Sequence, residues 1–323
     1  MKLANSYSSV KRRFSISGRN IVNRWTTMLP GAGCEYCKKT GGCTMCGFYQ
    51  ANKHYSFGWL YPAFIFKILF WIAKKEIREH RPQELYVYNG GSFFNPREIP
   101  DSFTKYLFKA VKKHPTLKRV LVESRVEYLG QEAINSALKL LGDKKLVVGI
   151  GLESSDDYVR NSLIRKGLSS GNFEKTVRML KRSGVEVLAY VFLKPLGLGE
   201  KDALEDTWWT IRYCRSLGIK EIVISCAFIQ EGTKMAIAYG RREYTPPNLW
   251  IIVELIRRAT NEGWIISIGS FDDEPPPLAI PHNDCPDDCS TIIYQLIEDY
   301  RQTGLFDFSK LPDCSCRSDR LIG

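Results

Sequence analysis

Residues 33–48 read GCEYCKKTGGCTMCGF and place four cysteines, Cys34, Cys37, Cys43 and Cys46, in one glycine-rich loop. Thiolate sulfur is a soft metal ligand, so cysteines at this density indicate a metal centre. Structural zinc sites made from two cysteine pairs usually hold the pairs about 12–20 residues apart. Five residues separate Cys37 from Cys43. This spacing favours an iron–sulfur cluster held by three thiolates, with a four-thiolate zinc site and free thiols as the alternatives.

After this loop, short apolar runs alternate with helical patterns. The apolar runs cover 84–88, 119–123, 145–149, 186–192, 221–225 and 265–268. The helical patterns cover 61–80, 101–113, 130–141, 156–165, 172–182, 202–216 and 247–261. Strands that alternate with helices indicate parallel βα units. We therefore expect an α/β protein with a partial (βα)6-type barrel, whose chemistry lies at the carboxyl ends of the strands.

Polar residues directly after the expected strands are the candidates for that chemistry. They are Asn89, Ser92, Glu123, Arg125, Glu153, Ser154, Lys194 and Gln230. An ion pair that only stabilises the barrel rim is the alternative interpretation of Glu123 and Arg125.

The composition changes near residue 271, where FDDEPPPLAIPHNDC is rich in proline. The segment leads into Cys285 and Cys289, and Cys314 and Cys316 follow near the end of the chain. Four thiolates can form a closed structural zinc site, which we favour here. A second iron–sulfur cluster, free thiols and a mixed site with His282 are the alternatives. We expect a basic segment at 1–30, a barrel at 31–270 and a cysteine-rich metal-binding extension at 271–323.

The chain carries a formal net charge of +11, and no acidic residue precedes Glu35. Such an excess of positive charge indicates a polyanionic partner, typically nucleic acid. The candidate contacts are Lys11, Arg12, Arg13, Arg19, Lys105, Lys109 and Lys112. Phe14 and Trp25 could stack on bases. The alternative is a solvated basic surface without a partner.

The N-terminus lacks the apolar core of a signal peptide, and ten cysteines without such a signal indicate a reducing compartment. We therefore expect a cytoplasmic protein. The apolar run at 59–73 is too short for a bilayer, which needs about 20 residues, and Lys67 interrupts it. We expect an amphipathic helix with a buried face and no membrane partner; a helix in the membrane interface is the alternative.

The cysteine loop in front of a βα barrel resembles the radical S-adenosylmethionine (SAM) superfamily, although the usual CxxxCxxC spacing is absent. GGCTMCGF, with a further cysteine nine residues before Cys43, is similar to the variant loop in the radical SAM subunit of archaeosine synthase. Other segments that resemble this family are GGSFFNPREIP (90–100), VESRVEYL (122–129), GIGLESSDDYVRNSLIRKG (149–167), FIQEGTKM (228–235), YTPPNLW (244–250) and PHNDC (281–285). The resemblance covers residues 33–316, and the loop spacing together with PHNDC is its most specific part.

The resemblance implies a [4Fe–4S] cluster on Cys34, Cys43 and Cys46, with Cys37 spare; Cys37 in place of Cys34 is the alternative. The iron without a protein ligand would bind the amino and carboxylate groups of SAM. The implied SAM contacts are Phe48, Asn89, Gly90, Gly91, Ser92, Glu123, Arg125, Glu153 and Ser154.

The resemblance also implies a reaction and a partner. In this family, a transglycosylase-like subunit attaches lysine to the nitrile of 7-cyano-7-deazaguanine in the tRNA D-loop. The radical SAM subunit then cleaves the lysine carbon–nitrogen bond and leaves the amidine of archaeosine. One alternative is a protein like the Elongator catalytic subunit, whose acetyltransferase domain would need more residues than follow the barrel here. A zinc-rich RNA-binding module is the other, but it leaves GGSFF and GIGLESS unexplained.

Overall fold

The computed structural model describes residues 8–47, 59–271, 276–285 and 287–317. Its eight strands form one sheet in which the spatial order follows the chain order. They are β1 (Ser8–Ser15), β2 (Asn20–Met28), β3 (Glu84–Tyr88), β4 (Arg119–Glu123), β5 (Lys145–Glu153), β6 (Glu186–Leu193), β7 (Glu221–Cys226) and β8 (Ser267–Ile268). β1 and β2 pair antiparallel, and from β2 onward neighbouring strands are parallel. The expected partial α/β barrel is confirmed.

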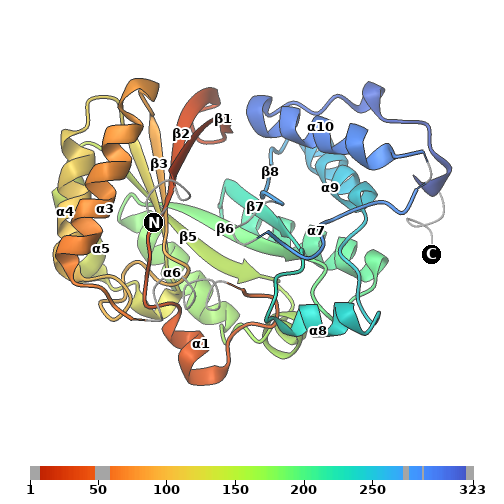
Figure 1. Cartoon of the computed structure of the whole chain (residues 1–323), viewed down its shortest axis with the longest axis horizontal. Helices are drawn as coiled ribbons and strands as arrows, with labels where there is room; N and C mark the ends of the chain where they lie inside the picture. Colours follow the sequence, from red (N-terminus) through yellow and green to blue (C-terminus); the bar gives the residue numbers. More distant parts are fainter. Residues whose placement is uncertain (1–7, 48–58, 272–275, 286, 318–323) are drawn as a thin grey trace.

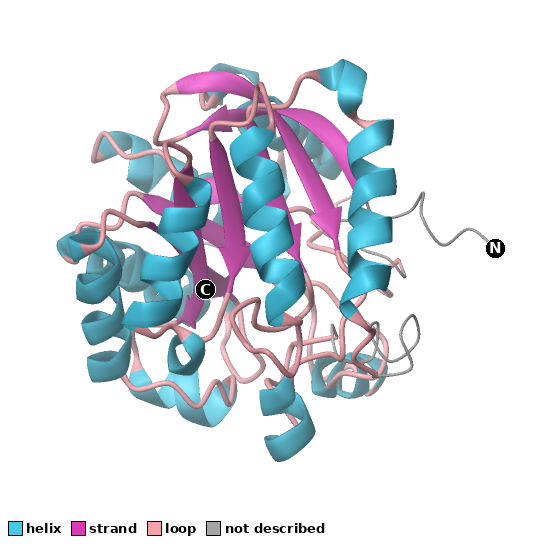
Figure 2. Ribbon diagram, turned by 90° about the vertical axis from the view of Figure 1, so that its left-hand side faces the viewer, coloured by secondary structure: helices cyan, strands magenta, loops and turns pink. Residues whose placement is uncertain are grey.

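Helices cover the outer face of the curved sheet (Figures 1 and 2). They are α1 (Glu35–Thr40), α3 (Ala63–Glu76), α4 (Asp101–Lys113), α5 (Gln131–Leu141), α6 (Ser170–Arg182), α7 (Glu200–Ser216), α8 (Lys234–Gly240), α9 (Leu249–Asn261) and α10 (Cys289–Thr303). Because side chains alternate along a strand, residues such as Val120 and Val122 pack outward into the main core. Their neighbour Leu121 faces inward with Tyr86 and Leu188.

The basic N-terminal segment contains two strands that the sequence pattern did not predict. β1 and β2 form a hairpin, and β2 continues the parallel sheet beside β3. Trp25 on β2 is fully buried, and its ring stacks on Phe70 with centroids 5.3 Å apart. The expectation that Trp25 could stack on bases is therefore wrong, because its ring belongs to the core. The division of the chain at residues 30 and 270 stays a prediction.

Two expected helices are shorter in the structure. The pattern at 61–80 becomes α3 and a 3-10 turn at Arg78–His80, while the pattern at 156–165 becomes a short helical stretch at 157–158 that runs into a π-helical turn at Val159–Leu163. The fully buried guanidinium of Arg160 explains the second case, because it donates to the carbonyls of Ser154 and Leu168 and draws the chain into a compact loop. No helix in the described residues is long and apolar enough to cross a bilayer.

Buried ion pairs close the end of the barrel where the parallel strands begin. Arg119 lies 3.1 Å from Glu84 and 3.0 Å from Glu186, and it also pairs with Glu221. Arg24 adds a further contact of 2.9 Å to Glu84. Since these charges bind one another, the opposite end, where the strands finish, is left for chemistry.

Candidate functional site

The loop that carries Cys34, Cys37, Cys43 and Cys46 (the loop cysteines) is anchored to the chain that follows β5. The backbone N–H of Thr44 donates to the carbonyl of Ile164 at 2.9 Å. The hydroxyl of Thr44 donates to Leu163 at 3.0 Å, and the hydroxyl of Tyr36 donates to Arg165 at 2.8 Å. These bonds hold the loop at the carboxyl end of the sheet, where α1 lies in Figure 1.

All four loop cysteines are half-buried and free of disulfides. Among the residues that the structure describes, the only group of three or more metal-type ligands within 4.8 Å lies elsewhere, in the C-terminal extension. Thiolates that bind different irons of a cluster stand further apart than thiolates on a single ion. The open spacing of the loop cysteines therefore fits an iron–sulfur cluster better than a four-thiolate zinc site.

Two cations lie beside the loop cysteines. Burial raises the pKa of Cys43, and the charges of Lys166 and Arg125 oppose that rise. The Arg125 guanidinium lies 3.8 Å from the centre of the Tyr36 ring and donates to the carbonyl of Lys166 at 3.0 Å. Positive charge held in this way suits ligands that bind as anions, such as thiolates and a carboxylate.

The turn Asn89–Ser92 after β3 lies against the loop. A Cβ atom at Gly91 would be 3.4 Å from the Cα of Cys34 and would clash with the carboxylate of Glu98. Gly90 has φ 62°, in the left-handed region that favours glycine. Asn89 is buried, and the Ser92 hydroxyl accepts from the backbone N–H of Arg125 at 3.2 Å. The turn therefore joins the loop to the end of β4.

Glu98 is a site residue that the sequence reasoning missed. Its buried carboxylate accepts from the backbone N–H groups of Ser92 and of Glu35, the latter at 2.9 Å, and from the side chain of Asn95 at 2.9 Å. Glu35 begins α1, so this carboxylate fixes the cysteine loop to the glycine turn. Its position in GGSFFNPREIP is the only signal that the sequence offers for it.

At the end of β4, burial raises the pKa of Glu123 to about 7, against the opposing effects of the neighbouring Tyr190 side chain and the charge of Lys166. At the end of β5, Glu153 has φ 71° and follows a break in the strand register. A side chain at this backbone angle is strained, and such strain is concentrated at functional sites. The Lys166 ammonium lies 2.7 Å from the Glu153 carboxylate. The sequence marks Lys166 only as one position of the motif at 149–167.

Two of the expected SAM contacts differ from the others. The hydroxyl of Ser154 donates to Asp206 on α7 at 2.6 Å, so it points toward a helix rather than toward the loop cysteines. Phe48 lies outside the described residues. The remaining expected contacts lie in the turn after β3 or at the ends of β4 and β5. Lys194, after β6, also has a positive φ of 64° and is buried against Glu200.

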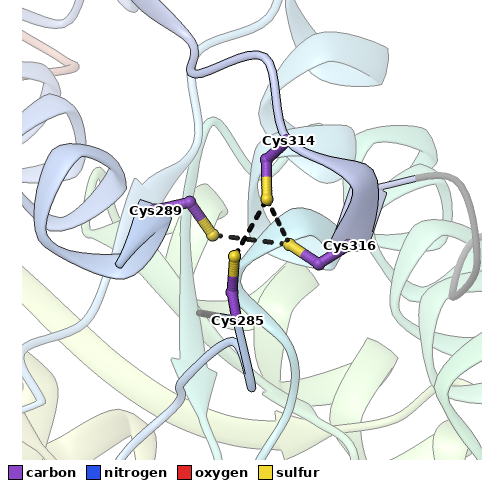
Figure 3. A group of neighbouring side chains, drawn as sticks. All are labelled: Cys285, Cys289, Cys314 and Cys316. Atoms are coloured by element: carbon purple, nitrogen blue, oxygen red, sulfur yellow. Dashed lines mark hydrogen bonds between the residues drawn. The ribbon is translucent and has the colours of Figure 1, made fainter. Parts of the chain in front are cut away.

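The four cysteines of the extension, Cys285, Cys289, Cys314 and Cys316 (the tail cysteines), converge as the sequence predicts (Figure 3). Cys285 and Cys314 have sulfurs 3.0 Å apart, and Cys289 and Cys316 have sulfurs 3.4 Å apart. A disulfide requires about 2.05 Å, whereas four sulfurs at the 2.3 Å zinc–sulfur distance form a tetrahedron with edges of about 3.8 Å. The spacing fits a single tetrahedral ion.

Side-chain donors surround the tail cysteines. The amide of Asn283 donates to the sulfur of Cys289 at 3.2 Å, and the indole N–H of Trp250 donates to Cys316 at 3.1 Å. Such second contacts orient thiolate ligands and reduce their negative charge. The donor set and its closed geometry therefore fit a structural metal site.

The residues expected to contact nucleic acid lie in two separate places. Lys11 and Arg12 are exposed on β1, Arg13 is beside them, and Arg19 is exposed in the turn between β1 and β2. Lys105, Lys109 and Lys112 are exposed on α4. Figure 1 places α4 on the opposite side of the molecule from α10, which lies near β1. The structure therefore does not combine these groups into one surface.

No known family model matches the chain. It is 30% identical over 253 residues to the archaeosine synthase subunit beta of Methanosarcina acetivorans, covering 76% of this chain and 70% of that protein. It is 28% identical to the archaeosine synthase subunit beta of Thermococcus kodakarensis, covering 71% and 69%. An uncharacterized protein of Methanocaldococcus jannaschii is 29% identical, covering 77% and 66%. The chain spans about two thirds of the length of these relatives.

Two solved structures share the fold. Elp3 of Methanocaldococcus infernus, with an N-terminal deletion, has a TM-score of 0.54 and 17% identity, with 76% of this chain and 66% of that chain covered. A radical SAM methyltransferase of Sphaerobacter thermophilus has a TM-score of 0.50 and 13% identity, with 81% and 76% covered. The sheet and its helices therefore have the arrangement found in a radical SAM enzyme.

Proposed function

The chain belongs to the family of archaeosine synthase subunit beta, and from this premise we propose that it is a radical SAM enzyme of tRNA modification. Its reaction is cleavage of the lysine carbon–nitrogen bond in the lysine adduct of 7-cyano-7-deazaguanine in the tRNA D-loop. The nitrogen stays on the base and completes the amidine of archaeosine. The observation that carries this proposal is the cysteine loop packed against the glycine turn at the carboxyl end of the barrel.

In this proposal, Cys34, Cys43 and Cys46 hold three irons of a [4Fe–4S] cluster. When bound, the cluster and SAM supply an electron and a 5′-deoxyadenosyl radical. Gly90 and Gly91 let the backbone approach SAM closely, and Glu123 accepts hydrogen bonds from its hydroxyl groups. Arg125, held over Tyr36, attracts the carboxylate of SAM.

The proposed partners are tRNA and the second, transglycosylase-like subunit of archaeosine synthase, and we propose that they meet the protein in the cytoplasm. The name of the relatives, subunit beta, supports a second subunit. The exposed basic residues of β1 support a polyanionic substrate. For the tail cysteines we propose a zinc ion, because their sulfurs converge on one tetrahedral position.

The decisive test is an anaerobic assay with reductant, SAM and tRNA that carries the lysine adduct. We expect archaeosine in the tRNA and 5′-deoxyadenosine in the supernatant, both measured by mass spectrometry. Cys43→Ala is the matched inactive variant, and Cys226→Ala, a buried cysteine on β7, is the control that keeps activity. SAM cleavage without archaeosine would mean that the protein is a radical SAM enzyme with another substrate.

A second test concerns the tRNA surface. Reversal of Lys11, Arg12 and Arg13 to Glu should weaken tRNA binding and flatten the slope of log affinity against log salt, by about 0.9 for each duplex phosphate that the variant no longer neutralises. The matched control is the reversal of Lys105, Lys109 and Lys112 on α4, measured by the same filter-binding titrations. If only the control variant loses affinity, the tRNA lies on the α4 side of the molecule.

A further inference from the structure

A cavity of about 340 Å³ opens on the side of the barrel between β1 and α10, and we call it the lateral cavity. Its volume lies within the range of roughly 300–1,000 Å³ that is typical of small-molecule sites. Strands at both edges of the sheet contribute to it, since Lys11 comes from β1 and Ser267 from β8. The cavity therefore occupies the gap that remains because β1 and β8 do not pair with each other.

Tyrosine side chains line the inner part of the lateral cavity. They are Tyr86 and Tyr88 from β3 and Tyr190 from β6. The Tyr86 and Tyr88 rings stand 6.5 Å apart at 79° to each other, and the Arg24 guanidinium lies 4.2 Å from the centre of the Tyr86 ring. Aromatic faces of this kind stack on nucleic acid bases without requiring a particular base. The inner wall thus suits a flat heterocycle.

Tyr190, which lines the inner end of the cavity, lies near Glu123 of the proposed SAM site. A Cβ atom at Gly149 would lie 3.0 Å from the Tyr190 ring and 3.4 Å from the side chain of Glu123. The neighbouring Tyr190 side chain also lowers the pKa of Glu123, against the effect of burial. A ligand in the cavity would therefore have its far end close to the strand-end residues.

The mouth of the cavity is positively charged. A second, outer hollow of about 380 Å³ shares Lys11, Arg13, Ser270 and Arg301 with the cavity. Four basic side chains line this hollow, counting Arg12, and Glu298 is the acidic side chain there. Arginine and lysine side chains in such a position bind phosphate groups. The outer hollow therefore suits a sugar–phosphate backbone.

The outer wall, α10, is held from both ends. Its first residue is Cys289, one of the tail cysteines. Farther along, Glu298 pairs with Arg13 of β1 at 2.8 Å, and the Tyr300 hydroxyl donates to the carbonyl of Ile266 at 2.8 Å. The helix is thus bonded to both edges of the gap.

From these features we infer that the lateral cavity receives a single nucleotide everted from a folded RNA. The base lies among the three tyrosines, and the neighbouring phosphates lie in the outer basic hollow. This inference rests on the proposed function, because an enzyme cannot reach an atom of a stacked base and must take that nucleotide out of the stack. Entry from the side delivers the base to Glu123 and the SAM site while the rest of the tRNA stays outside.

The first experiment locates the RNA. The photoreactive residue p-benzoylphenylalanine replaces Thr26 inside the cavity, or Asn135 on the exposed face of α5 as the control. After irradiation with lysine-adduct tRNA, primer extension maps the cross-linked nucleotide. We expect the Thr26 probe to attach to the modified D-loop nucleotide and the Asn135 probe to give no such product. A cross-link elsewhere, or none, in protein that still retains the tRNA on filters overturns the inference.

The second experiment fills the cavity with Val223→Trp. We expect tRNA affinity by filter binding to stay unchanged while single-turnover product formation falls roughly 100-fold, because the base can no longer reach its position. Thr26→Phe serves if Val223→Trp does not fold, and Ile237→Trp on exposed α8 is the matched control. Undiminished turnover in a folded filled variant overturns the inference. Failure of unaltered protein to bind tRNA at all would overturn the proposed function as well.

Discussion

The loop cysteines and the tail cysteines are two sets of four thiols that the same chain holds in opposite ways. The tail cysteines come from two segments that α10 separates, yet their sulfurs lie together and accept N–H donors from Asn283 and Trp250. The loop cysteines lie within thirteen residues of one another in sequence but do not converge in that way, and Lys166 and Arg125 lie beside them. A closed set of sulfurs suits a structural ion, whereas an open set leaves room for a reactive cluster and its ligand.

The largest expected effect concerns the loop cysteines. Cys34→Ala, Cys43→Ala or Cys46→Ala should each remove the iron–sulfur absorbance of anaerobically reconstituted protein and abolish SAM cleavage, because in the proposed site each of these thiolates would hold a different iron. Cys37→Ala is the matched control and should keep most of both. Loss of the cluster in Cys37→Ala, with retention in Cys34→Ala, would exchange the two cysteines in the ligand assignment.

The next largest effect concerns the tail cysteines. Cys314→Ala combined with Cys316→Ala should release one metal equivalent and lower the thermal midpoint by on the order of 5–10 °C, since about 1 kcal/mol shifts a domain of this size by a few degrees. Elemental analysis and calorimetry measure the two quantities. The loop cluster should still assemble, which its absorbance reports. An unchanged metal content would contradict a tail metal site.

A second comparison concerns two buried carboxyl groups, Glu123 and Glu84, which lie at opposite ends of the barrel. Burial raises the pKa of Glu123 to about 7, so between pH 5 and 7 the folded protein binds more protons than the unfolded chain. Protonated Glu123 makes its full contribution to the free energy of unfolding below about pH 4.5. This contribution is lost as the pH rises through 7. Glu123→Gln should therefore stabilise the SAM-free protein at pH 8 by up to a few kcal/mol, but not at pH 5.

Urea denaturation at both pH values measures this difference. Glu84 is the control at the other end of the barrel, where burial alone would raise its pKa but the charges of Arg24 and Arg119 lower it. Glu84→Gln should therefore destabilise the protein at neutral pH. Equal effects of the two substitutions would contradict the assigned pKa of Glu123.

The smallest expected effect concerns the donors around the tail cysteines. Trp250→Phe keeps an aromatic ring but removes the N–H that points at Cys316, so the affinity of the proposed tail site for zinc should fall by about 10–100-fold. Competition with a chromophoric chelator measures it. Trp264→Phe is the matched control, because that ring stacks on Trp208 and has no role at the cysteines. An unaltered affinity in Trp250→Phe would mean that the thiolates alone fix the ion.

The sequence predicted the central strands and the long helices because their apolar periodicity is strong and uninterrupted. It also predicted that the tail cysteines share one site, because all four are soft metal ligands. The turn at Asn89–Ser92 and the ends of β4 and β5 were predicted as one region from the rule that parallel strands end at the same edge.

Other features depend on segments that meet only in the folded chain. β1 carries Lys11, Arg12 and Arg13, and these charges obscure its alternation, so the hairpin was missed. Glu98 and Lys166 gain their roles from backbone groups and charges on other segments, which no local pattern encodes. α10 follows a proline-rich stretch that reads as irregular, although CSTIIYQLIEDYRQT forms a helix.

The pairing of Arg13 with Glu298 joins residues 285 positions apart, while the strands pair in the order in which they occur along the chain. During synthesis on the ribosome, the sheet can therefore grow strand by strand from its N-terminal hairpin. Closure between the first strand and α10 has to wait until residues beyond 289 have emerged. Until then Phe14, which lies against Gly304 in the finished protein, has no cover from that helix. The nascent barrel therefore keeps this apolar side uncovered until α10 has been synthesised and has packed against β1.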